Sequence, residues 1–324
     1  MLTGVMRAVA LLLTGAFVIA ASCLTGDAAE VVATPDVCGG EHPVDPAGGR
    51  YTCTFGDEFD GTGFDMSKWM AQDTSFSGMT SGNKDCYRDS TDVISVSDGA
   101  AHISARRTDA PFTCRSPLGD FTSQSIVGTV ATRTHFAQTY GRFEFRARFP
   151  DATVPGVHSA LWLYPADNTY GPWPASGEID VAEWFSNTPT KVYPSAHYTG
   201  EVPFQSSGFD CNVATPHDFH TYAVDWTPSS MYFFVDDKLC WQHSWSAQSP
   251  LPGSGPFDQP FYLVLTQVFG AETNAVSAAT PGVATTDVDW VRVFRWDGDE
   301  AVGSSMHLVN PKLGSALSLG SGAK

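Results

Sequence analysis

The stretch that decides the fold is Ser176-Gly177-Glu178-Ile179-Asp180-Val181-Ala182-Glu183-Trp184-Phe185, which places three carboxylates within six residues of an otherwise apolar run. Its β-branched and aromatic residues are typical of a strand. Because side chains alternate between the faces of a strand, Glu178 and Asp180 point to one side and Glu183 points to the other. One extra residue in a β-bulge would bring Glu183 to the same face, and bulges are common beside active sites. The sequence therefore predicts a bulge near Val181-Ala182 and three acids on one face.

Acids that share a face repel one another and raise each other's pKa, which is costly unless a site uses them. Two carboxyl groups that flank a glycosidic bond are the usual requirement for its hydrolysis. In the retaining reaction one ionised carboxylate attacks the sugar carbon, while the other donates a proton to the leaving oxygen and then activates water. The alternative is an acidic edge strand that faces water and only keeps the chain soluble.

The wider segment Trp173-Pro174-Ala175-Ser176-Gly177-Glu178-Ile179-Asp180-Val181-Ala182-Glu183 resembles the signature of glycoside hydrolase family 16. Its spacing is similar to the bulged form found in the laminarinase-like β-1,3-glucanases of that family. Other stretches resemble further strands of the family and occur in the family's order between residues 51 and 296. They are residues 56–61 followed by Trp69, 140–147, 160–163, 220–228 and 288–293.

The resemblance implies that Glu178 is the nucleophile, Glu183 the acid/base, and Asp180 the residue that supports the nucleophile. It also implies an all-β fold of two packed antiparallel sheets, a concanavalin-like β-sandwich or jelly roll, with a substrate cleft on the concave face. Strand-like alternation with frequent turn residues from residue 51 onward favours the same fold.

Sugars are bound by aromatic faces and by polar groups at the rim of a cleft. Trp162, Trp173 and Trp184 flank the acids in the sequence and are candidates for this role, with core packing as the alternative for each. The resemblance adds His197, which matches a family histidine near the acid/base.

The resemblance also places Asn83 and Tyr87 in a loop that often contacts substrate. The chain departs from the laminarinase-like pattern at His158-Ser159-Ala160-Leu161-Trp162 and at Thr266-Gln267-Val268-Phe269-Gly270-Ala271. Both segments face the cleft in relatives, so Gln267 is a further candidate for substrate binding.

Glu58 and Asp289 match positions that help to hold a structural calcium away from the cleft in many relatives, and oxygen ligands suit calcium. The alternative is two solvated surface acids. We expect no cofactor for catalysis. The cysteines and histidines lack metal-ligand spacing, which argues against a zinc site.

Residues 1–29 are predicted to be a secretory signal, with Arg7 before an apolar stretch too short to span a bilayer comfortably. Ala20-Ala21-Ser22-Cys23 weakly resembles a bacterial lipobox, so a lipid anchor at Cys23 is the alternative to a freely secreted chain. No later segment is apolar enough for a membrane helix. Residues 30–50 are predicted to be an N-terminal extension, 51–296 the glycoside hydrolase domain, and 297–324 a C-terminal tail.

The chain has seven cysteines, and removal of Cys23 with the signal leaves an even number for an oxidising compartment. Many pairings are formally possible. Proximity along the chain favours the pairs Cys38–Cys53, Cys86–Cys114 and Cys211–Cys240.

The formal net charge of −17 argues against nucleic acid, anionic lipid and polyanionic substrates, which prefer basic patches. The sequence thus predicts a secreted, monomeric, retaining endo-glycoside hydrolase of β-glucan, with β-1,3 linkages preferred. One alternative is a transglycosylase on the same scaffold, in which a sugar hydroxyl replaces water. The other is a noncatalytic glucan-binding or lectin-like protein, and the retention of Glu178, Asp180 and Glu183 favours an enzyme over it.

Overall fold

The computed structural model describes residues 36–40, 43, 51–202 and 204–297. The predicted signal with Cys23, most of the predicted extension and nearly all of the predicted tail lie outside these residues. Within the described part, no helix is long and apolar enough to cross a membrane.

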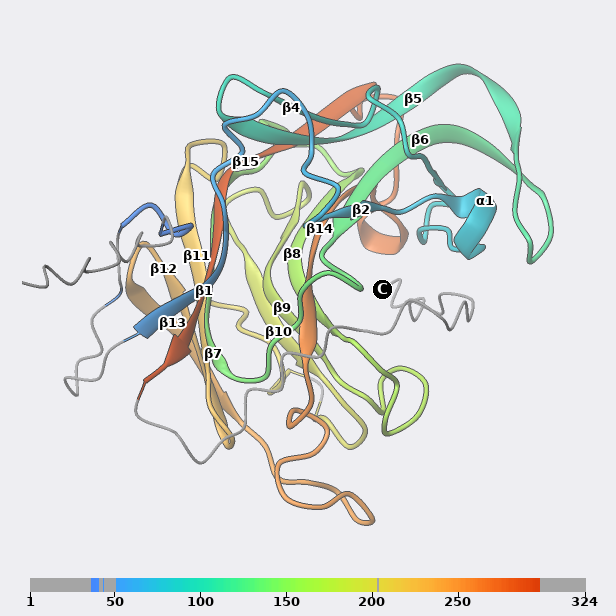
Figure 1. Cartoon of the computed structure of the whole chain (residues 1–324). Helices are drawn as coiled ribbons and strands as arrows, with labels where there is room; N and C mark the ends of the chain where they lie inside the picture. The colour runs from blue at the N-terminus through green and yellow to red at the C-terminus, as the bar shows by residue number, and fades with distance from the viewer. Residues whose placement is uncertain (1–35, 41–42, 44–50, 203, 298–324) are drawn as a thin grey trace, which may run out of the picture. The chain divides into compact units, whose positions relative to one another are not determined.

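The described chain is built almost wholly from antiparallel strands, with two short helical turns, α1 (Thr74–Ser77) and η1 (Glu272–Asn274). Eight strands form the first sheet, most of which lies on the left in Figure 1. They are β1 (Tyr51–Asp57), β4 (Ile94–Ser97), β5 (Ala100–Cys114), β7 (Gly141–Arg148), β11 (His220–Trp226), β12 (Ser230–Val235), β13 (Lys238–Ser244) and β15 (Val283–Trp296).

The second sheet carries the acidic strand and runs in the order β10-β9-β8-β14-β6. Its strands are β6 (Phe121–Ala131), β8 (Val157–Pro165), β9 (Glu178–Phe185), β10 (Tyr193–His197) and β14 (Phe261–Phe269), with the short β2 (Met70–Ala71) added to β6. The two-residue β3 (Cys86–Tyr87) pairs with β6 in parallel.

The strand β6 belongs to both sheets. Its first part, up to Val127, pairs with β5, and its last part, from Gly128, pairs with β14. A side chain at Gly128 would not fit, because a Cβ there would lie 2.4 Å from the backbone oxygen of Val93. A strand that passes from one sheet to another bends at the corner, and glycine is common at such tight bends. In Figure 1, β5 and β6 arch across the top between the two sheets.

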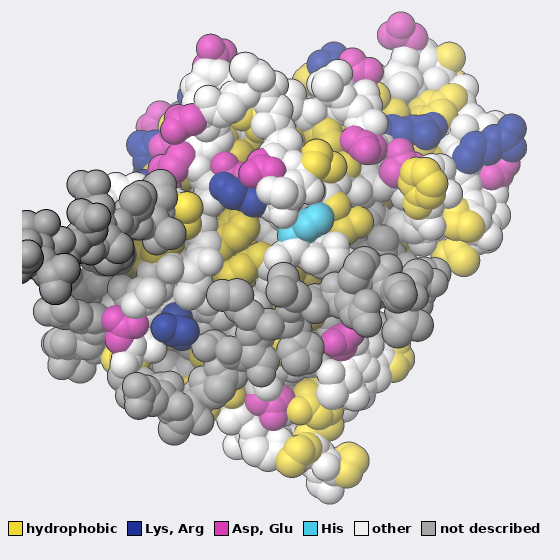
Figure 2. Space-filling model, in the orientation of Figure 1, with side chains coloured by type: hydrophobic (Ala, Val, Ile, Leu, Met, Phe, Trp, Pro, Cys, Tyr) yellow, Lys and Arg dark blue, Asp and Glu magenta, His cyan; other side chains and the backbone are white. Residues whose placement is uncertain are grey.

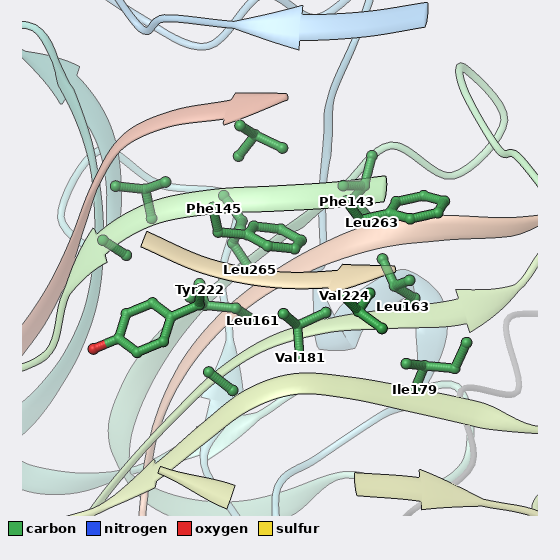
Figure 3. Close-up of a cluster of buried hydrophobic side chains, with 14 of the residues drawn as sticks. Phe143, Phe145, Leu161, Leu163, Ile179, Val181, Tyr222, Val224, Leu263 and Leu265 are labelled. Carbon is green, nitrogen blue, oxygen red and sulfur yellow. The ribbon is translucent and has the colours of Figure 1, made fainter. Parts of the chain in front are cut away.

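The main hydrophobic core lies between the sheets (Figure 3). The residues that meet there are Phe143 and Phe145 of β7, Tyr222 and Val224 of β11, Leu161 and Leu163 of β8, Ile179 and Val181 of β9, and Leu263 and Leu265 of β14. All of them are buried. Complete burial of one such side chain contributes about 1.5–3 kcal/mol, so this layer is a major source of stability. The predicted two-sheet, all-β fold is confirmed.

The three disulfide pairs expected from proximity are all present: Cys38–Cys53, Cys86–Cys114 and Cys211–Cys240. Two of them fasten segments that border the second sheet. Cys86 follows the loop 79–82, and Cys211 lies beyond β10. On the face drawn in Figure 2, acidic side chains occur at separate points, several beside a Lys or Arg, rather than as one patch.

Candidate active site

The strand β9 contains the predicted bulge. Across the pair β8–β9, Leu161 lies opposite Ala182 and Trp162 lies opposite Asp180, so Val181 is the extra residue. Val181 and Ala182 are both buried in the core between the sheets. The regular alternation therefore restarts after the bulge, as the sequence predicted.

Because of this bulge, Glu178, Asp180 and Glu183 all face away from the core. They line one cleft on the second sheet, together with side chains from β6, β8, β10 and β14. The loop 79–82 and Ala271 border the same cleft. The arrangement brings the predicted catalytic acids together on one surface.

His197 of β10 lies between two of the carboxylates. Its Nε2 is 3.3 Å from Oδ2 of Asp180, and its Nδ1 is 3.1 Å from Oε2 of Glu201. Burial acts to lower the pKa of His197, but hydrogen bonds to Asp180 and Glu201 and the charges of Asp180 and Glu178 outweigh it and raise the pKa to about 11. The side chain is thus an imidazolium at neutral pH, and it places one positive charge among the acids.

The acids on the Glu178 side of the cleft hold their protons more tightly than isolated carboxyls do. Burial raises the pKa of Glu178 well above its usual range, the charge of Asp180 raises it further, and the positive His197 opposes both. Burial and the charge of Glu183 raise the pKa of Asp180 to about 6. This part of the site therefore exchanges protons close to neutral pH.

Glu183 has different surroundings from Glu178. Its side chain is one-fifth exposed, and Oε1 is 3.1 Å from Nε2 of His158. The His158 ring in turn stacks on Phe185, with the ring centroids 4.3 Å apart. The more open acid of the pair is thus held by a histidine, in a position from which it can exchange protons with solvent.

The cleft is lined by three of the residues that were predicted to bind substrate: Trp162, Trp173 and Tyr87. The indole Nε1 of Trp162 donates to Oγ1 of Thr266 at 3.0 Å. The Trp173 ring lies 5.9 Å from His197, and its buried Nε1 faces the carboxyl of Glu178, where it acts to lower the pKa of that group. Trp173 therefore offers a ring to a ligand and a donor to Glu178.

The prediction that Trp184 binds substrate is wrong. Its side chain is fully buried, its ring stacks on Phe149 with centroids 5.9 Å apart, and its Nε1 donates to the backbone oxygen of Pro189. The reason is the bulge itself: once Glu183 faces the cleft, the next residue on the strand must face the core.

The prediction for Gln267 is also wrong. Its side chain is fully buried, accepts hydrogen bonds from Ser159 and Thr286, and donates to backbone oxygens of β8 and β14. The neighbours Thr266 and Val268 face the cleft instead. Gln267 therefore supports the cleft from behind and does not contact a ligand in it.

Asn83 does not line the cleft, although Ser81 and Gly82 before it do. Its amide donates to the buried carboxylate of Asp85, which also accepts from Ser81 and from the backbone N–H of Phe269. Asn83 thus helps to fix one wall of the cleft.

The two acids proposed for calcium each contact an arginine. Glu58 forms a bidentate ion pair with Arg292, in which Nε and Nη2 of the arginine lie 2.8 and 2.9 Å from the two carboxylate oxygens. Asp289 pairs with Arg146. In the described part of the chain, neither acid belongs to a group of three close metal-ligating side chains. This arrangement does not favour the calcium site, which stays a prediction.

Four residues of the site were not predicted from the sequence: His158, Thr266, Phe185 and Glu201. His158 and Thr266 stood inside the two segments that depart from the family pattern, so the signal was present but was assigned to the wrong neighbour. Glu201 follows the end of β10, and no periodicity marks it as a partner of His197.

A pair of glutamates on one wall of an aromatic cleft, across an antiparallel sheet of a β-sandwich, defines a glycoside hydrolase site. The comparison with known families agrees: residues 86–292 match the sequence model of glycosyl hydrolases family 16. The chain belongs to this family, as the sequence analysis predicted.

Two of the similar proteins and one solved structure are bacterial. The chain is 34% identical over 273 residues to glucan endo-1,3-beta-glucosidase A1 of Niallia circulans, a match that covers 78% of this chain and 39% of that protein. It is 33% identical over 261 residues to a beta-glucanase of Rhodothermus marinus, covering 76% and 86%. The solved structure of the laminarinase from Rhodothermus marinus superposes with a TM-score of 0.64 and 31% identity, over 76% of this chain and 98% of that one.

Proposed function

We propose that the protein is a retaining endo-glycoside hydrolase that cleaves β-1,3-linked glucan by double displacement. The observation that carries the proposal is the bulge in β9, which turns Glu178 and Glu183 to the same cleft. The names of the relatives support the choice of β-1,3-glucan.

In the first step, the ionised carboxylate of Glu178 attacks the anomeric carbon of the sugar. Glu183 donates its proton to the glycosidic oxygen, the bond to that oxygen breaks, and the leaving part of the chain departs with a new hydroxyl. The product of this step is an ester between the sugar and Glu178.

In the second step, Glu183 acts as the base. It takes a proton from water while the water oxygen attacks the anomeric carbon, and the carboxylate of Glu178 is released. Two displacements at the same carbon restore the original configuration. If a sugar hydroxyl takes the place of water, the same site performs transglycosylation.

The neighbours of the two glutamates have separate roles in this reaction. Burial disfavours the ionised Glu178 that the first step needs, and the imidazolium of His197 offsets part of that cost. Asp180, whose pKa is about 6, lies beside His197, and its charge and hydrogen bond help to keep that imidazolium protonated. His158 orients Glu183 through its 3.1 Å contact.

We further propose that the enzyme is secreted and acts as a monomer. Three disulfides support an oxidising compartment.

The test is the release of reducing ends from laminarin by the purified protein, with mixed-linkage β-glucan for comparison and Glu178→Gln as the blank. Turnover of laminarin that disappears in the variant supports the proposal. Analysis of the products separates hydrolysis from transglycosylation, since only the latter yields chains longer than the substrate. A folded protein that binds laminarin without releasing products would be a glucan-binding protein instead.

A further inference from the structure

A row of aromatic rings leaves the cleft beside Glu183 and reaches the surface. It begins at Phe185, which lines the cleft, and continues through Tyr193, Phe209 and Phe204. Successive ring centroids are 5.8, 5.9 and 5.6 Å apart. We call these four side chains the aromatic row.

The backbone shows that the row continues the face of the sheet on which the cleft lies. Tyr193 of β10 pairs with Glu183 of β9, so the two side chains share a face. The segment 206–213 then runs beside β10 as a further, irregular strand. Its backbone accepts from Ala196 and Val192, and Gly208 donates to the oxygen of Pro194.

The outer half of the row is exposed. Phe209 is 41% exposed and Phe204 is 81% exposed. Single exposed apolar side chains are common and need no explanation, but connected patches mark surfaces that bind something. These rings add little to the core, so folding alone does not account for them.

The platform under the row is well anchored. The disulfide Cys211–Cys240 fastens the segment 206–213 to β13, and Gly208 sits so close to Trp241 that an added Cβ would lie 2.8 Å from the Trp241 Cβ. The Nζ of Lys191 donates to the backbone oxygen of Phe209 at 3.3 Å. At Phe209 a ligand would meet a ring on a fixed backbone, which lowers the entropy cost of binding.

We infer that the aromatic row extends the substrate cleft and binds the sugar rings of a long, uncharged polysaccharide chain beyond the catalytic acid. The inference rests on the proposed function, because it takes the occupant of the row to be the glucan held in the cleft. The apolar faces of pyranose rings suit aromatic faces, and the row is continuous with the cleft through Phe185. A neutral glucan is also not repelled by a chain of net charge −17.

The test replaces Phe204 and Phe209 together by alanine in the full chain. We expect kcat/KM on laminarin to fall by at least about fivefold, since each ring contributes an aromatic contact. The value for a short β-1,3-gluco-oligosaccharide should change by less than about twofold, because a short chain does not reach the row. Phe76→Ala is the matched control: this ring is 83% exposed but belongs to neither the cleft nor the row. Circular dichroism checks that each variant is folded.

Binding is measured in parallel by affinity electrophoresis in laminarin, with Glu178→Gln present in every chain so that no turnover occurs. Unchanged laminarin binding and turnover in the double variant would overturn the inference, and so would an equal loss on the short substrate. A change in sedimentation without a loss of laminarin binding would show that the row joins copies of the chain instead. A chain that binds but does not cleave laminarin, and loses binding in the double variant, would keep the inference and refute the hydrolase. A chain that neither binds nor cleaves it would refute both.

Discussion

His197 in the cleft and Arg142 on the first sheet are each buried among three carboxylates. Around Arg142, Nε is 2.5 Å from Glu144, Nη1 is 3.1 Å from Asp225, and Nη2 is 3.1 Å from Asp237. Each nitrogen of the guanidinium donates to a different acid. This cluster is satisfied by directed hydrogen bonds, and its cation does not titrate in the working range of proteins.

The cluster around His197 has a similar charge balance but a different hydrogen-bond balance. Nε2 of His197 lies 3.3 Å from Oδ2 of Asp180, which is longer than any of the three contacts of Arg142. Burial raises the pKa values of Glu178 and Asp180, as it raises that of Glu144 beside Arg142, but only the His197 cluster contains an acid, Asp180, with a pKa of about 6. The comparison teaches that a buried charge cluster serves the fold when short hydrogen bonds fix its charges, and serves chemistry when one of its members titrates near neutral pH.

The largest effect should come from Glu178→Gln. The amide cannot attack the anomeric carbon, so kcat on laminarin should fall by at least about 10³-fold. The free energy of unfolding should stay equal or rise, because a buried acid beside Asp180 is removed. The matched change in the other cluster, Glu144→Gln, should do the reverse and lower stability by about 1–3 kcal/mol with kcat unchanged. Loss of activity in both variants would contradict the claim that only the cluster around His197 takes part in catalysis.

Arg142→Met should have the next largest effect, on stability alone. It leaves Glu144 buried without its cation, which costs about 3–5 kcal/mol when a buried pair is broken. Denaturant unfolding measures the loss, and kcat per folded molecule should not change. Arg142→Lys keeps the charge and should lose less. A stability loss below about 1 kcal/mol for the methionine variant would contradict the role given to this cluster.

His197→Gln should move the pH dependence of catalysis. The reaction needs ionised Glu178, so the rate falls as the pH drops through the raised pKa of that carboxyl. Removal of the imidazolium raises this pKa further, and the acidic limb of kcat/KM should shift to higher pH. His102→Gln removes a histidine that pairs with Asp287 outside the cleft, and should leave the profile in place. An unshifted acidic limb would show that His197 does not act on Glu178.

The same substitution also predicts a change in stability with pH. The pKa of His197 is raised from 6.5 to about 11, so its stabilising contribution is fully present below pH 6.5 and is lost as the pH rises toward 11. The difference in free energy of unfolding between the original chain and His197→Gln should therefore shrink over that range.

The smallest effect should come from Trp173→Phe, which keeps a ring and removes an Nε1 donor that faces Glu178. Loss of this donor should raise the Glu178 pKa further, so kcat/KM on laminarin at neutral pH should fall by about three- to tenfold with stability nearly unchanged. Trp226 offers the control, since its Nε1 is buried and unpaired in the described structure and lies in the core. Trp226→Phe should alter stability and leave kcat/KM unchanged. An unchanged kcat/KM in Trp173→Phe would mean that this donor does not act on Glu178.

The sequence predicted those features that follow from alternation along one strand. Three acids had to share a face, which required the extra residue that proved to be Val181. The same alternation should have placed Trp184 in the core, and closeness in sequence was the wrong guide. On β14 the register was unknown, so Gln267 and its neighbour Thr266 could not be told apart.

Contacts between distant parts of the chain were beyond reach. Glu201 meets His197 only because the chain turns back after β10, and the acids around Arg142 come from β7, from β11 and from the turn after β12. The disulfides were predictable because each one joins neighbouring parts of the chain.

The cleft is sensitive to substitution at Gly128, where β6 passes from one sheet to the other. Thr129, the next residue, lines the cleft, while Val127, the residue before, pairs with the first sheet. The bend closes only because nothing stands between Gly128 and the Val93 backbone. A methyl group at this position would collide with the backbone oxygen of Val93 and push the second sheet away from the first. The cleft therefore depends on a glycine at position 128, because only a residue without a side chain lets β6 pass from one sheet to the other here.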